Sequence, residues 1–251
     1  MSRVLIPALC VAALLGPVPV GRTAEDDPKA VIVQAVKAHG GEETLAKFQA
    51  VQSSGKGKIT LAGLGEVDFT QEIASMPPDK LKESLDLTVN GQNVRVLTLV
   101  NGDKMSIEAN GTAIDVTDAI KSAMKDASYL LKISRLVPLV REKGYEFSTV
   151  GEIKVEGKPA VGVRVSAKGQ KDINLYFDKE SHLLVKLEHR TVDPSNGNEV
   201  NEERIIQEYR KNSDGMQIPT KVLVHHDGKK FLEAEVEAKF LEKLDESEFK
   251  K

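Results

Sequence analysis

The sequence predicts an α+β fold in which a long antiparallel β-meander forms a curved, incomplete barrel (a half-barrel). Helices are expected to pack on its concave face or to cover it. Apolar and polar residues alternate through most of the chain after residue 50, which is typical of half-buried strands. Turn-forming pairs such as Asn-Gly and Asp-Gly separate these segments at fairly regular intervals. One mid-chain stretch, residues 115–144, replaces the alternation with helical spacing.

Two dozen residues precede this fold and have the order of a secretory signal peptide. Arg3 comes first, a short apolar run follows it, and a Gly-Pro pair ends the run. The run is shorter than the ~20 residues that a membrane-spanning helix needs. We therefore expect residues 1–24 to be a signal peptide cleaved near Ala24. The exported or periplasmic product would be one domain, residues 25–251, without a transmembrane segment.

Residues 28–48 predict an N-terminal pair of short helices. Val31 and Ala35 recur at helical spacing, and Gly40 with Gly41 ends the first helix. The second helix continues the apolar stripe until the period changes to two, near residue 50.

The first strands contain a hairpin whose register the sequence defines. Alternating apolar residues lie on both sides of an Asn-Gly turn at residues 90–91. A two-residue loop there places Leu87 opposite Val94. Leu85 then faces Val96, so the apolar faces of the two strands coincide.

The mid-chain helix can be capped by Asp115 or by Thr117. Its apolar face extends as far as Val137, and Pro138 kinks or ends the helix. Two interpretations stay open. The helix either packs on the sheet and completes an ordinary core, or it forms a lid over a cavity on the curved sheet.

The alternation resumes after this helix and predicts a further series of strands. They cover residues 145–155, 159–167, 172–178, 183–192, 202–211, 218–226 and 230–240. Turn signals separate each strand from the next, as expected for an antiparallel meander.

The last hairpin can close in two registers. A three-residue loop over 226–228, with its glycine in the left-handed position of a bulge, places Val222 opposite Leu232 and keeps the apolar faces together. A two-residue loop over 227–228 would place Val222 opposite Glu233 and mix apolar with charged faces. We therefore expect the three-residue loop.

Two adjacent histidines, His225 and His226, lie at the end of this hairpin and raise the question of a metal site. Neighbouring residues of a strand point to opposite faces, so the two rings do not converge on one ion. A row of glutamates in the last strand, Glu233, Glu235 and Glu237, is interpreted as a solvated face. We expect the histidines to form an exposed hairpin tip, and we predict no metal and no cofactor.

The composition excludes several classes of function. Cys10 is the only cysteine and lies in the leader, so the exported chain has no disulfide or thiol chemistry. The net charge of -3 becomes about -5 without the two leader arginines, tryptophan is absent, and aromatic residues make up 4%. The chain therefore lacks the basic field and the stacking rings that bind nucleic acids. It also lacks H-E-x-x-H, G-x-S-x-G and phosphate-binding glycine motifs.

Four short stretches of sequence occur in a recognisable order along the meander and its helix: "KAHGGEETLAKFQAVQSSGKGKI", "LYFDKESHLLVKLEHR", "DGMQIPTKV" and "LDESEF". With them the chain resembles the lipoprotein-carrier-like superfamily, the type of the outer-membrane lipoprotein-sorting chaperone and its receptor. The resemblance extends over most of the exported chain. It implies a half-barrel whose helix-covered concave face holds acyl chains or another lipid-like ligand, and it brings no catalytic residues.

We therefore expect an exported, non-enzymatic binding protein that holds a lipid or a lipoprotein acyl chain in an apolar cavity. One alternative is an envelope interaction or sensor module on the same fold, and a more distant one is a hydrolase that uses scattered carboxylates and His189. The candidate cavity residues are apolar side chains of the first strands and the helix: Val67, Phe69, Ile73, Leu85, Leu87, Val94, Val96, Leu130, Leu131 and Val137. An ordinary packed core would use the same residue types.

Overall fold

The computed structural model describes residues 27–193 and 197–250. The expected signal peptide, residues 1–24, lies outside these ranges. The helices are α1 (Pro28–Ala38), α2 (Glu42–Lys47), α3 (Asp118–Ser134), α4 (Val137–Arg141) and the 3-10 helix η2 (Glu246–Phe249). The strands are β1 (Ala50–Leu61), β2 (Gly65–Met76), β3 (Lys80–Val89), β4 (Gln92–Asn101), β5 (Lys104–Ala109), β6 (Thr112–Ile114), β7 (Tyr145–Val155), β8 (Lys158–Ala167), β9 (Ile173–Asp178), β10 (Leu184–Val192), β11 (Glu199–Lys211), β12 (Gln217–His226) and β13 (Lys229–Leu241).

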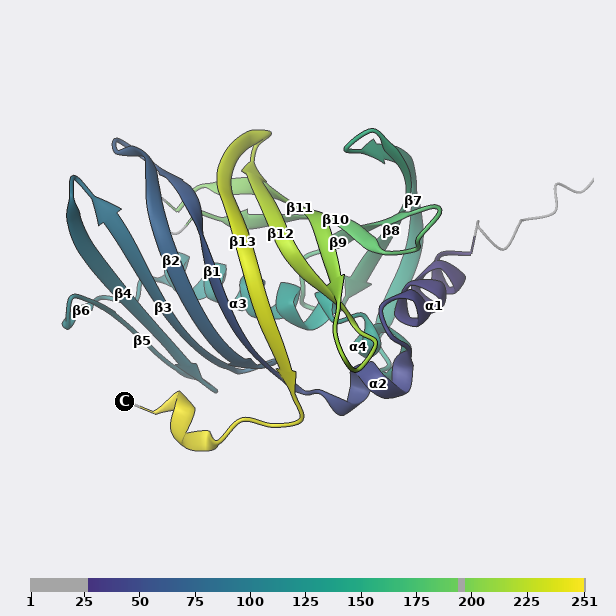
Figure 1. Cartoon of the computed structure of the whole chain (residues 1–251), viewed down its shortest axis with the longest axis horizontal. Coiled ribbons are helices and arrows are strands. Elements are labelled where there is room, and N and C mark those ends of the chain that lie inside the picture. The colour runs from purple at the N-terminus through teal and green to yellow at the C-terminus, as the bar shows by residue number, and fades with distance from the viewer. Residues whose placement is uncertain (1–26, 194–196, 251) are drawn as a thin grey trace, which may run out of the picture.

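The strands of the described chain form one antiparallel sheet in the order β6-β5-β4-β3-β2-β1-β13-β12-β11-β10-β9-β8-β7. The sheet curves around α3, which runs behind β1 and β13 in Figure 1. Strands β6 and β7 remain as its two edges, so the sheet is not closed into a barrel. The predicted half-barrel with an N-terminal helical pair and a mid-chain helix is confirmed.

The first and last strands pair in the middle of this sheet, because β1 lies against β13 over ten residue pairs. Gly57 of β1 pairs with Ala234 at a very close approach. A Cβ atom on Gly57 would lie 1.9 Å from the carbonyl oxygen of Glu233. Glycine is therefore required at this position for the chain ends to pair as they do.

The main core lies on one side of the sheet, where α1, α3 and α4 pack on β8, β9 and β10. Its fully buried side chains include Ile32, Ile133, Val165, Leu175 and Phe177. Polar contacts also fix α3 here, since Asp126 accepts hydrogen bonds from Thr191 Oγ1 at 3.2 Å and from Lys171 Nζ at 2.9 Å. These hydrogen bonds attach α3 to β10 and to Lys171, which precedes β9.

The mid-chain helix is shorter than the sequence pattern predicts. Thr117 is the N-cap, and its side chain accepts a hydrogen bond from the Ile120 amide. The helix ends at Ser134, and Leu136 adopts a positive φ of 62° before α4 begins. Val137 therefore lies in α4 and not on the apolar face of α3. Leu136 is only 1% exposed, so its burial maintains a backbone conformation that leucine rarely adopts.

The two hairpin predictions have different outcomes. The Asn-Gly turn places Leu87 opposite Val94 as expected. The last hairpin instead closes with the two-residue turn 227–228, in which both residues have positive φ. Its strands restore their apolar register by a bulge at Phe231, so Val224 faces Leu232.

A candidate ligand-binding site on the inner face

The inner face of the half-barrel is the side of the sheet that faces α3. Alternate residues of β1 point to it, beginning with Val51 and Ser53, and their neighbours in β2 and β13 do the same. On the opposite, outer face, the intervening side chains are polar and exposed, as at Gln52 and Ser54. The site described below is built on the inner face.

An apolar cavity of about 230 Å³ lies between the C-terminal half of α3 and the inner face. Leu131 and Leu136 line it from the α3 side. The apolar side chains that line it from the sheet include Ile73 of β2, Ile206 of β11, and Val236 and Phe240 of β13. Because these side chains come from both ends of the chain, the cavity depends on the pairing of β1 with β13.

His39 and Tyr209 supply polar atoms to the cavity wall, yet neither is charged there. His39 Nδ1 donates to the Ala35 carbonyl at 2.8 Å, and its Nε2 lies 3.4 Å from the Leu184 amide. Tyr209 donates to the Leu184 carbonyl at 2.6 Å. Burial lowers the pKa of His39, against the backbone hydrogen bond, and raises the pKa of Tyr209. A neutral imidazole and a neutral phenol keep this wall compatible with an apolar ligand.

Arg135 closes one edge of the cavity at the end of α3. Its guanidinium donates to the carbonyl oxygens of Phe48 and Gln49, the latter at 2.8 Å. Burial lowers the pKa of Arg135. These contacts attach the C-terminal end of α3 to the start of β1.

A polar belt, defined as Gln71, Glu83 and Arg204, adjoins the cavity on the inner face. Glu83 is the direct cross-strand partner of the cavity residue Ile73. Gln71 Nε2 donates to the Glu83 carboxyl group. Burial raises the pKa of Glu83, while the Gln71 hydrogen bond and the charge of Arg204 act in the opposite direction. The inner face is therefore polar next to the cavity.

A second polar group, the Glu202 cluster, consists of the buried residues Glu202 and His189 and the partly buried residues His226 and Arg204. The Glu202 carboxylate accepts hydrogen bonds from His189 Nε2 at 3.3 Å, His226 Nε2 at 3.1 Å and Arg204 Nε at 2.6 Å. Burial alone would raise the pKa of Glu202. The charge of Arg204 and the three hydrogen bonds outweigh burial and hold that pKa well below its usual range.

The expectation of an exposed histidine tip is wrong, because both histidines lie in β12 and are only partly exposed. The ring of His226 stacks on Phe231 at 3.9 Å between centroids and donates to Glu202. The strand register shifts at Phe231, next to the stacked pair of rings. His225 lies on the other face and contacts Glu203 at 3.8 Å, so the two histidines do point apart as predicted.

The arrangement of the Glu202 cluster differs from that of a metal site. The described residues contain no group of three or more His, Cys, Asp or Glu side chains arranged to hold a metal ion. The guanidinium of Arg204 next to Glu202 opposes cation binding. Both imidazoles of the cluster donate to the Glu202 carboxylate. Among the described hydrogen bonds, neither imidazole is paired with a serine, threonine or tyrosine hydroxyl group that it could activate as a nucleophile.

The structure separates the ten candidate cavity residues into several places. Val67, Phe69, Leu85, Leu87 and Val94 gather in one apolar cluster with residues of β1 and β13. Val96 lies opposite Leu85. Only Ile73 and Leu131 line the apolar cavity. Leu130 is buried in the main core, and Val137 is buried in α4.

Sequence reasoning missed several residues of this site. Neither His39 and Tyr209 nor the polar belt was among the candidates. The string "AHGG" places His39 at the end of the first helix, which could have indicated its burial. The pairs His189 with Glu202 and Glu202 with His226 are direct cross-strand partners, so correct strand registers would have revealed this cluster.

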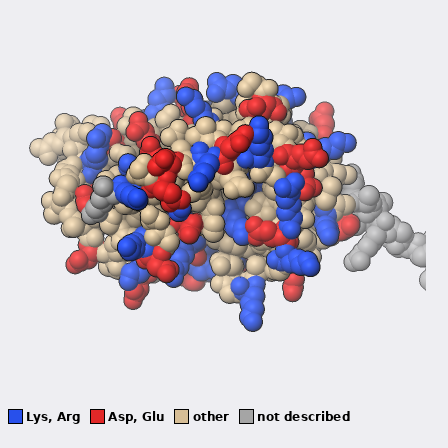
Figure 2. Space-filling view, turned by 90° about the horizontal axis from the view of Figure 1, so that it is seen from below, with Lys and Arg blue, Asp and Glu red and all other residues tan. Residues whose placement is uncertain are grey.

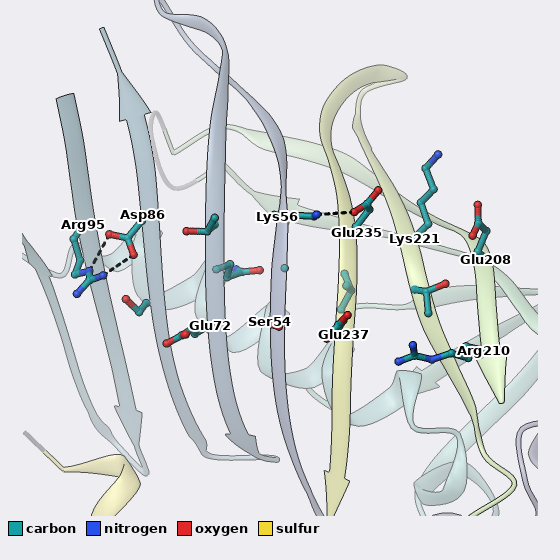
Figure 3. Close-up of a pocket in the computed structure, with 16 residues that line it drawn as sticks. Ser54, Lys56, Glu72, Asp86, Arg95, Glu208, Arg210, Lys221, Glu235 and Glu237 are labelled. Carbon is teal, nitrogen blue, oxygen red and sulfur yellow. Dashed lines mark hydrogen bonds and ion pairs between the residues drawn. The ribbon is translucent and has the colours of Figure 1, made fainter. Parts of the chain in front are cut away.

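Two of the larger hollows are lined mainly by polar residues. The outer groove, about 780 Å³, crosses the outer face between β4 and β11 and is lined by charged side chains of both signs (Figure 3). Within it Lys56 pairs with Glu235 at 3.3 Å and Arg95 with Asp86 at 2.9 Å. A hollow of about 1100 Å³ beside α3 is lined by Lys125, among many other polar residues. On the face shown in Figure 2, acidic and basic side chains are likewise interspersed.

The fold defines a class of architecture, an open antiparallel half-barrel with a helix along its inner face. No family model and no curated protein matches the sequence. A solved structure of a DUF1329 family protein from Desulfovibrio piger matches with a TM-score of 0.53 and 16% identity, over 90% of this chain and 98% of the other. At this identity the match shows a common fold.

Two further solved structures are similar to the chain. One is described as an outer membrane lipoprotein-sorting protein domain from Vibrio parahaemolyticus, with 11% identity, a TM-score of 0.49, and coverage of 87% of this chain and 97% of the other. The second is a LolA superfamily protein from Nitrosomonas europaea, with 10% identity, a TM-score of 0.49, and coverage of 86% and 97%.

In the part of the chain that the structure describes, no helix is both long enough and apolar enough to cross a bilayer.

Proposed function

We propose that this chain is an exported, non-enzymatic binding protein that holds a lipid or acyl chain on the inner face of its half-barrel. The apolar cavity between α3 and the sheet is the observation that supports this proposal. Apart from Arg135 at one edge, its wall has no charged side chain among the described residues, since His39 and Tyr209 are uncharged, and it suits an apolar ligand better than the charged outer groove does. The signal-peptide pattern of residues 1–24 accounts for export.

The cavity volume limits what part of a ligand it can hold. At about 230 Å³ it is smaller than the ~300–1,000 Å³ typical of pockets for whole small molecules. A methylene is close in size to a water molecule, which occupies ~30 Å³, so the cavity has room for about eight such groups. At ~0.8 kcal/mol per buried methylene, a chain segment of that length would stabilise the complex by up to roughly 6 kcal/mol.

The test is lipid extraction and native mass spectrometry of the protein purified from its own cell envelope. We expect a co-purifying lipid in the unaltered chain and its loss in Leu131→Trp, because the indole would fill the cavity. Leu64→Trp is the matched control, since Leu64 lies in a turn and is 48% exposed. Repeated absence of lipid from the unaltered protein would contradict the proposal.

A second candidate is an interaction module that binds an envelope protein. The outer groove favours it, because a hollow of about 780 Å³ with charges of both signs suits a polar partner surface. A specific envelope protein captured equally well by the unaltered chain and by Leu131→Trp would favour this function over lipid binding. Loss of capture with Leu131→Trp would instead connect the partner to the cavity.

A further inference from the structure

The polar belt lies at the end of the apolar cavity, as the strand registers show. Glu83 pairs directly with the cavity residue Ile73, and Gln71 lies two residues before Ile73 on the same face. Arg204 lies two residues before Ile206, which is also a cavity residue. A ligand that filled the cavity and extended past these residues would meet all three polar side chains.

Curvature of the sheet brings the two sides of this belt toward each other. Four strands separate β3, which carries Glu83, from β11, which carries Arg204. The charge of Arg204 nevertheless acts on Glu83, because both residues are on the inner face of a sheet that curves around α3 (Figure 1). The belt therefore spans the concave side from one wall to the other.

The guanidinium of Arg204 has hydrogen-bond donors that are not used within the described residues. Its Nε donates to Glu202 at 2.6 Å, but its two terminal nitrogens have no hydrogen-bond partner among the described residues. Its side chain is 35% exposed, so the guanidinium is within reach of a ligand. On the facing wall, Gln71 donates to one oxygen of Glu83. A protonated Glu83 would present a further donor from its other oxygen.

We propose that the polar belt binds the anionic headgroup of a single-chain amphiphile, a carboxylate or a phosphate monoester, while its tail occupies the apolar cavity. The inference rests on the proposed function and narrows it to one class of ligand. Planar guanidinium donors match carboxylate and phosphate oxygens. The volume of about 230 Å³ admits one chain segment and not several.

The test compares four probes by titration calorimetry with the signal-free protein: dodecanoate, dodecyl phosphate, dodecanol and inorganic phosphate. We expect the unaltered protein to bind one or both anionic amphiphiles at least about tenfold more tightly than dodecanol. Inorganic phosphate is expected to bind far more weakly, because it has no tail. The ratio between dodecanoate and dodecyl phosphate identifies the headgroup.

Two variants locate the headgroup. Arg204→Gln should weaken binding of the preferred anionic amphiphile roughly 10- to 100-fold and leave dodecanol unchanged. Arg190→Gln is the matched control, because Arg190 is also a strand arginine paired with a glutamate, Glu199 at 3.1 Å, but its side chain is 67% exposed. Glu83→Gln keeps a hydrogen-bond donor at this position and removes a group that can become negatively charged. Affinity for the preferred anionic amphiphile should therefore be retained or increased.

Each contrary outcome has a definite meaning. Equal affinity of the unaltered protein for dodecanol and for both anions would overturn the headgroup proposal and leave the cavity proposal standing, without any variant that must fold. If inorganic phosphate bound as tightly as the amphiphiles, the proposal of an amphiphilic ligand would be overturned in favour of a soluble anion. Absence of binding by all four probes would overturn this inference together with lipid binding.

Discussion

Two halves of one continuous sheet differ in how they are packed. In β8, β9 and β10 the inward side chains are fully buried, as at Val163, Leu175 and Phe177. In β3 and β4 most side chains are only partly buried along the whole strand. None of the largest fully buried side chains among the described residues comes from β1 to β6.

The difference shows which part of the fold has a filled core and which part has space between the helices and the sheet. Helices α1 and α3 fill the concave side in front of β8 to β10. In front of β1 to β4 they leave smaller apolar clusters, the apolar cavity and the polar belt. The proposed ligand site lies on this part of the sheet, which the helices cover less completely.

The comparison is tested most strongly by truncating one apolar side chain in each half. Phe177→Ala should lower the free energy of unfolding by about 4 kcal/mol, because its ring is fully buried and the core cannot collapse around the void. Leu85→Ala should cost roughly 1 kcal/mol, since Leu85 is only partly buried. Urea unfolding measures both values, and equal losses would show that the two halves are packed alike.

A second prediction concerns the Glu202 cluster, which joins β10, β11 and β12 at the boundary of the two halves. Glu202→Gln should lower the free energy of unfolding by roughly 2 kcal/mol at neutral pH, because three hydrogen bonds to an ionised carboxylate are weakened. The side chain of Arg204 is 35% exposed, so water compensates part of its lost counter-charge. Glu208→Gln, an exposed position on the same strand, serves as the control.

The same cluster predicts a pH dependence with a definite sign. The folded pKa of Glu202 is depressed, so its contribution is complete above the ordinary value of 4.5 and is lost as the pH falls below it. Unfolding free energies measured from pH 7 down to pH 3 should therefore fall more steeply for the unaltered protein than for Glu202→Gln. Parallel curves would contradict an ionised, hydrogen-bonded Glu202 in the folded state.

Much of the fold could be predicted because its signals are local. The alternation of apolar residues specifies strands, and the Asn-Gly pair at 90–91 specifies a two-residue turn whose register the apolar faces confirm. The register predicted for the last hairpin was wrong because the observed register depends on Phe231, which forms a bulge in the strand ladder and stacks on His226. That contact forms only in the folded protein, so the turn sequence alone does not reveal it.

The site was harder to predict than the fold for a physical reason. Leu130 and Leu131 are adjacent leucines on one predicted helical face, yet one is 2% exposed in the main core and the other lines the cavity. Composition and spacing are the same for both. The polar belt was missed because Glu83 and Arg204 are 121 positions apart in the sequence, and only the curvature of the sheet relates them.

These two leucines provide the finest test of the comparison, and the one with the smallest expected effect. Leu130→Phe inserts extra volume into a filled core and should lower the free energy of unfolding by about 2 kcal/mol. Leu131→Phe places the same ring beside the cavity of about 230 Å³ and should change that free energy by less than about 0.5 kcal/mol. Helix propensity is the same in both variants, so it cancels in the difference. If urea unfolding gave a loss at Leu131 as large as that at Leu130, the space in front of β1 and β13 would be filled in solution, and a ligand could enter only by displacing α3.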